Sequence, residues 1–100
     1  MATSLMLEGA PYAFGPFPIK LHLRYEMTAG KECLCSGEGT TVSISSRAVV
    51  FESLAILPTQ RSVRLSIDWP VSGMTLDVQG RTEQLGQHTA VQIMRHGFRH

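Results

Sequence analysis

Apolar and polar residues alternate one by one along two stretches of this chain, and no stretch repeats with the period of a helix. The first stretch has apolar residues at every second position: Ile19, Leu21, Leu23, Tyr25 and Met27. The second repeats the pattern with Val63, Leu65, Ile67 and Trp69. Such alternation predicts strands that bury one face and expose the other. These apolar side chains, including that of Trp69, are therefore expected in the core.

Four more strands are predicted from β-branched runs that lie between turn residues. They cover Thr40–Ile44, Ala48–Phe51, residues 76 to about 85, and residues 89 to about 94. Ser45, Ser46 and Arg47 form a tight bend between the first two of these strands. Residues 31–39 contain both cysteines and two glycines, and they are expected to form a polar loop.

Six short strands with turns about every ten residues predict an all-β fold with little or no helix. An antiparallel barrel and a sandwich both fit, and a closed six-stranded barrel is favoured because closure removes exposed strand edges. Glycines and prolines interrupt the first 16 residues, which are therefore expected to form a flexible arm. Residues 17–100 are expected to form one barrel domain.

Composition excludes several classes of function. A net charge of +1 gives no overall field that would attract nucleic acid or a membrane surface. Cys33 and Cys35 supply only two of the four ligands of a typical zinc site, so we expect reduced thiols and no metal. No serine or cysteine is paired by motif with a histidine and an acid, so we expect no enzyme and no cofactor. Without a secretion signal or a membrane-spanning run, the expected location is the cytoplasm.

Several segments together carry a family resemblance. They are Gly37–Ser53, Leu57-Pro58, Val63–Pro70, Val78–Arg81, Ala90–Ile93 and Phe98-Arg99. In this order and spacing they resemble the PilZ domain family over residues 17 to 99. The resemblance implies a six-stranded antiparallel barrel that acts in bacterial signalling and is not an enzyme. The best-known members bind cyclic di-GMP.

The resemblance also implies where that ligand would bind. The family uses an Arg-x-x-x-Arg pair before the first strand and an Asp/Asn-x-Ser-x-x-Gly turn after the second strand. Here the two arginine positions fall at Tyr12 and Pro16, which cannot donate the bidentate bonds of arginine. The turn is kept in part, with Ser43 and Ser45 present and Ala48 in place of the glycine. Together with Arg47 in the bend, these residues indicate a degenerate cyclic di-GMP site.

Three functional hypotheses follow. The preferred one is a protein-interaction module whose partner is a protein. The alternative is a rewired cyclic di-GMP receptor, in which at least two substitute cations converge on Ser43 and Ser45. The candidate cations are Lys20, Arg24, Arg47 and Arg81. A domain that binds single-stranded nucleic acid through Tyr12, Phe14 and Phe17 is the third and is not expected.

Each residue of the degenerate site also has a purely structural interpretation. The two serines would stabilise the turn through local bonds, and Arg47 would be a solvated surface charge. Family members often carry a helix after the last strand, and we expect none here. The surface under that helix would then be bare, or covered by a partner or by a second copy in a homodimer.

Overall fold

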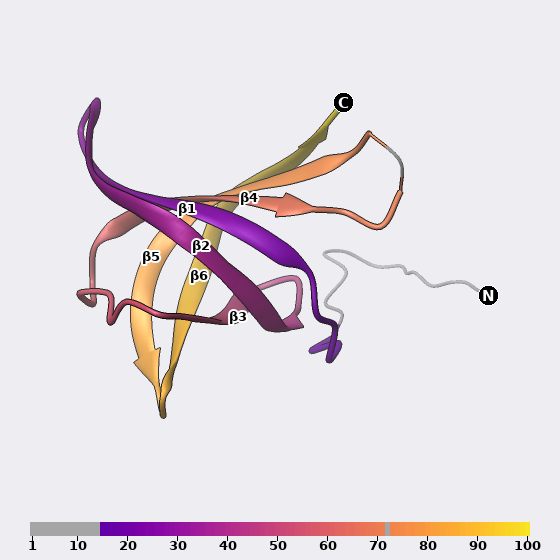
Figure 1. Cartoon of the computed structure of the whole chain (residues 1–100), viewed down its shortest axis with the longest axis horizontal. Coiled ribbons are helices and arrows are strands. Elements are labelled where there is room, and N and C mark those ends of the chain that lie inside the picture. The colour runs from indigo at the N-terminus through magenta and orange to yellow at the C-terminus, as the bar shows by residue number, and fades with distance from the viewer. Residues whose placement is uncertain (1–14, 72) are drawn as a thin grey trace.

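The computed structural model describes residues 15–71 and 73–100. Six antiparallel strands close into a barrel in the order β1-β2-β3-β6-β5-β4 (Figure 1). The strands are β1 (His22–Ala29), β2 (Glu32–Ile44), β3 (Ala48–Ser53), β4 (Ser62–Asp68), β5 (Thr75–Leu85) and β6 (His88–Arg99). The predicted all-β, six-stranded antiparallel barrel is therefore confirmed. Of the predicted flexible arm, only Gly15 and Pro16 fall within the described residues, whereas Tyr12 and Phe14 lie outside them.

The alternating pattern places the core as predicted. Leu23, Tyr25 and Met27 of β1 are buried, as are Val63, Leu65 and Ile67 of β4. These two strands pair with each other through Leu23↔Ile67 and Tyr25↔Leu65, and this pairing closes the barrel. Alternation along two strands distant in sequence thus fills one interior, where burial of each large apolar side chain contributes about 1.5–3 kcal/mol.

The prediction of a polar loop over residues 31–39 is wrong. Residues 32–39 belong to β2, which pairs with β1 along this part, so Cys33 and Cys35 lie in a strand and not in a loop. Both thiols are free and exposed. The glycines that suggest a loop allow close approach instead: a methyl group at Gly37 would overlap the Tyr25 ring.

Two buried threonines attach non-strand segments to the barrel. The Thr82 hydroxyl donates to the Pro58 carbonyl at 2.7 Å and accepts from the Arg61 amide at 3.1 Å. The Thr41 hydroxyl donates to the Ile19 carbonyl at 2.5 Å and accepts from the Leu21 amide at 2.7 Å. Each hydroxyl is satisfied as donor and acceptor, so its burial carries no penalty for an unpaired polar group.

Strand β6 extends further than the predicted end near residue 94. Strand β3 pairs with it only over Thr89–Gln92, whereas β5 accompanies it as far as Arg99. The register between β5 and β6 shifts between Gln79 and Gly80. Residues 75–79 of β5 and 95–99 of β6 therefore extend beyond β3. We call this part of the sheet the β5–β6 extension.

Candidate functional site

The bend between β2 and β3 is held by Ser45 itself. The Ser45 hydroxyl accepts from the backbone amides of Arg47 at 3.2 Å and Ala48 at 3.1 Å. This is the local turn-stabilising pattern that serine commonly adopts. The side chain of Ser43 lies on the outer side of β2, where this residue pairs with Val50. Arg47 is exposed, and its carbonyl accepts from the Ile93 amide at 2.8 Å.

The substitute cations are spread around the barrel. Lys20 lies beside β2, because its neighbours Ile19 and Leu21 both bond to Thr41. Arg81 shares an outer row with Ala48, since both residues pair with Gln92 from opposite sides. Two strand spacings place the backbones of Arg81 and Ala48 about 10 Å apart.

Arg24 is in a different place. It pairs with Glu38 and Ser66, and its guanidinium lies 3.9 Å from the Asp68 carboxylate. Arg47 therefore lies in the bend itself and Lys20 lies beside β2, whereas Arg81 is two strands away from Ala48 and Arg24 is on another face. None of these four side chains forms a hydrogen bond with Ser43 or Ser45 in the described residues.

A charged cluster surrounds His22 on the outside of β1. Its Nε2 lies 2.7 Å from a Glu38 oxygen, and its Nδ1 lies 3.0 Å from an Asp68 oxygen. The hydrogen bond to Glu38, and secondly that to Asp68, raises the pKa of His22 above its usual value of 6.5. Since the carboxylates bind opposite ring nitrogens, they favour the doubly protonated imidazolium.

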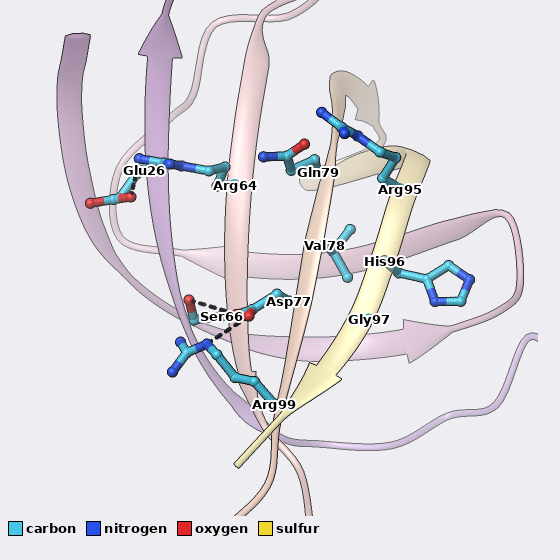
Figure 2. Close-up of a pocket in the computed structure, with 10 residues that line it drawn as sticks. All are labelled: Glu26, Arg64, Ser66, Asp77, Val78, Gln79, Arg95, His96, Gly97 and Arg99. Carbon is cyan, nitrogen blue, oxygen red and sulfur yellow. Dashed lines mark hydrogen bonds and ion pairs between the residues drawn. The ribbon is translucent and has the colours of Figure 1, made fainter. Parts of the chain in front are cut away.

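A polar groove lies on the outer face of the barrel across β1, β4, β5 and β6, with a volume of about 490 Å³ (Figure 2). Strand register builds it in two rows of outward side chains. One row runs Glu26–Arg64–Gln79–Arg95, and the next row runs Ser66–Asp77–Gly97. Gly97 leaves the floor of the groove open, because a Cβ atom there would meet no other atom within 4 Å.

Three arginines surround this groove, and two of them are held by carboxylates. Arg64 bonds to Glu26 at 2.8 Å, and Arg99 bonds to Asp77 at 2.6 Å (Figure 2). The bond to Asp77 also raises the pKa of Arg99, which therefore stays charged. Arg95 has no hydrogen-bond or ion-pair partner within residues 15–71 and 73–100.

An apolar groove of about 340 Å³ lies on the opposite face of the β5–β6 extension. Its lining is almost wholly apolar: Phe17, Ile19, Ile44, Trp69, Leu76, Val78, Ile93 and Phe98, with Ser45, Ser46 and His96. The Trp69 ring meets the Phe98 ring edge-on at 5.2 Å. Trp69 packs against the core as predicted and is only half-buried, so it also forms part of this surface.

A backbone edge lies beside the apolar groove. Beyond the Ile93 amide, which bonds to Arg47, the side of β6 that faces away from β5 has no backbone partner among the residues that the structure describes. An unpaired strand edge next to an apolar surface is the arrangement to which an extended peptide can add. Sequence reasoning missed both grooves, because each gathers residues from strands that are distant in sequence.

Comparison of the chain with protein-family models, with curated proteins and with solved structures finds no match. In the described part of the chain, no group of three or more His, Cys, Asp or Glu side chains is arranged to hold a metal ion. The same part contains no helix that is both long and apolar enough to cross a membrane.

Proposed function

We propose that this chain is a PilZ-like bacterial signalling domain, not an enzyme, that acts in the cytoplasm by binding a protein partner. The observation that carries the proposal is the apolar groove beside the unpaired edge of β6. Phe17 and Phe98, which both line the groove, are each about half exposed, at 54% and 51%. Apolar surface that is gathered in a concave, solvent-exposed site is typical of interaction surfaces.

The partner that fits this surface is an extended segment with apolar side chains at alternate positions. Its backbone would pair with the free edge of β6, and its apolar side chains would enter the groove. Among residues 15–71 and 73–100, the groove lining contains no acidic or permanently charged side chain, and His96 is its one titratable group. A charged side chain buried there would lack an ion-pair partner, so the segment is apolar on the face that enters the groove.

The degenerate cyclic di-GMP site belongs to the same proposal. Its support is that Ser45 uses its hydroxyl within the bend and that Arg24 lies on another face beside Asp68. In a calorimetric titration we expect no saturable heat up to high micromolar cyclic di-GMP. Micromolar binding that Arg47→Ala weakens would instead support the rewired receptor and contradict this part of the proposal.

Peptide selection tests the docking surface. A displayed library of short peptides, selected on the whole chain, should yield sequences with alternating apolar residues. Their binding, followed by the fluorescence of the single tryptophan, Trp69, should be lost in Phe98→Ser. The same change at the fully exposed Leu54, which is outside the groove, should leave binding intact.

The edge of β6 is tested separately. Methylation of alternate peptide amides removes backbone donors and leaves the side chains unchanged. Methylation on one register should abolish binding, and methylation on the other register should not. Equal binding of both peptides would show that the groove acts without strand addition. Failure to select any peptide that distinguishes Phe98→Ser from Leu54→Ser would contradict the proposed function itself.

A further inference from the structure

We propose that the polar groove of Figure 2 is a binding site for a small ligand that carries phosphate groups. The chemistry that recognises it is the set of arginines at Arg64, Arg95 and Arg99, with the Gln79 amide between the first two. Guanidinium groups bind phosphate oxygens through paired, charge-assisted hydrogen bonds. This inference does not depend on the apolar groove or on the cyclic di-GMP turn.

The spacing of the arginines suits one or two phosphate groups. Arg64 and Arg95 flank Gln79 in one row, so their backbones lie two strand spacings apart, about 10 Å. Arg64 is bonded to Glu26 on the side away from Gln79 (Figure 2), so its guanidinium has to turn toward Arg95 for the two arginines to bind one phosphate group from both sides. Arg99 lies four residues beyond Arg95 on β6, on the other side of the open floor at Gly97.

The acids in the groove orient two of the arginines. Glu26 holds Arg64, and Asp77 holds Arg99 while also lying 3.5 Å from the Ser66 hydroxyl. These pairs leave the groove with three arginines against two carboxylates, and Arg95 is the cation without a partner in the described structure. Arg95 is therefore expected to be the main contact of the ligand.

The lining also distinguishes a small phosphate ligand from a nucleic acid strand. Among the described residues, no aromatic ring other than the imidazole of His96 lines the groove, and in Figure 2 that ring points away from the other polar side chains. Single-stranded nucleic acid is usually bound by bases that stack on aromatic side chains along a basic path. The volume of about 490 Å³ is in the range of small-molecule sites.

Inorganic pyrophosphate is a suitable probe, titrated into the whole chain at low ionic strength by calorimetry and by amide NMR shifts. We expect saturable binding, with the largest shifts at Gly97 and its neighbours on β6. Arg95→Gln should weaken binding at least about tenfold, which is the effect of losing one bond to a charged group. Arg61→Gln, which removes the same charge from an exposed site outside the groove, should leave binding nearly unchanged.

A second variant blocks the groove without changing the charge. Gly97→Val places a side chain on the open floor, where a Cβ meets no neighbour, so the fold should tolerate it and pyrophosphate binding should be lost. Equal weakening by Arg95→Gln and Arg61→Gln would overturn the proposal, as would unchanged binding by Gly97→Val. Tighter binding of a single-stranded oligonucleotide than of pyrophosphate, at equal phosphate concentration, would overturn the assignment to a small ligand.

Discussion

Among single residues, His22 has a charge that depends on two neighbouring strands. Glu38 of β2 and Asp68 of β4 raise its pKa above 6.5, so the folded state holds this proton more tightly than the unfolded chain does. The stabilisation is complete below about pH 6.5 and is lost as the pH rises through the raised pKa. Because 44% of the His22 side chain is exposed, solvent screens these pairs and the effect on stability is small.

An NMR titration of the His22 ring measures this directly. We expect a midpoint above that of an ordinary histidine, and Glu38→Gln should lower it more than any other single change, since Glu38 makes the largest contribution. Removal of an unconnected acid, as in Glu83→Gln, should leave it unchanged. A midpoint at or below 6.5 in the unaltered chain would show that the two bonds do not persist in solution.

The hydroxyl oxygen of Thr82 is expected to contribute to the stability of the fold. Its buried hydroxyl donates to the Pro58 carbonyl and accepts from the Arg61 amide. Thr82→Val therefore removes a hydrogen-bond partner from each of these two backbone groups. We expect a loss of about 1–3 kcal/mol in the free energy of unfolding, measured by urea denaturation. Thr40→Val, at a half-buried position whose hydroxyl has no partner in the described part, should change it by less than about 0.5 kcal/mol.

The roles of Thr41 and Thr82 could not be predicted from the sequence. Threonine is common in strands because it is β-branched, and that property is the same on either face. The hydroxyl partners lie at residues 19 and 21 for one threonine, and at 58 and 61 for the other. Only the three-dimensional path of those segments brings their carbonyls and amides to the threonine side chains.

At the scale of elements, the shift of register between β5 and β6 depends on one glycine. A methyl group at Gly80 would overlap the carbonyl oxygen of Gln92, which belongs to backbone and cannot rotate away. Gly80→Ala should therefore cost about 1–3 kcal/mol or more in the free energy of unfolding. Gly97→Ala, in the same strand pair but with open space at the Cβ position, should be neutral or stabilise by up to about 1 kcal/mol.

Thermal unfolding of the two variants gives the comparison. Similar melting temperatures for Gly80→Ala and Gly97→Ala would mean that β5 and β6 can adopt another register, and the arrangement of both grooves would then not be fixed. A lower melting temperature for Gly80→Ala alone would confirm that this glycine fixes the register.

Strand β2 shows why element boundaries are harder to predict than strand identity. Its second half has β-branched residues, which predict a strand, whereas its first half contains cysteine, glycine and glutamate, which predict a loop. That half has mostly exposed side chains and is held by its backbone ladder with β1. Backbone pairing leaves no apolar pattern in the sequence, so periodicity could not reveal it.

For the whole molecule, closure of the barrel sets the expected folding kinetics. The closing pair is β1 with β4, and the neighbours β3 and β6 are also distant in sequence. These two pairings therefore require the closure of long loops before they can form, whereas the other four pairings join strands that are neighbours in sequence. We expect single-exponential folding over milliseconds to seconds, followed by stopped-flow fluorescence of Trp69. Folding in microseconds would contradict this view of the topology.

The sequence is sufficient to predict the barrel and insufficient to predict its sites. The alternating sequence pattern predicts that the side chains of Arg24, Arg64 and Arg81 point outward. Only the strand register shows that Arg64 shares a row with Arg95 and that Arg81 does not. The apolar groove likewise joins Phe17 to Phe98, which lie far apart along the chain. Neighbouring residues are enough to predict on which face of a strand a side chain lies, whereas a site depends also on strand order and register.

The two grooves lie back to back on the β5–β6 extension, and Val78 and His96 border both of them. A tilt of this strand pair would therefore reshape the proposed anion site and the proposed peptide site together. Thermodynamic linkage makes any such coupling reciprocal: if the anion strengthens docking by some factor, docking strengthens anion binding by the same factor. A single layer of sheet would then couple the binding of one ligand to the binding of the other.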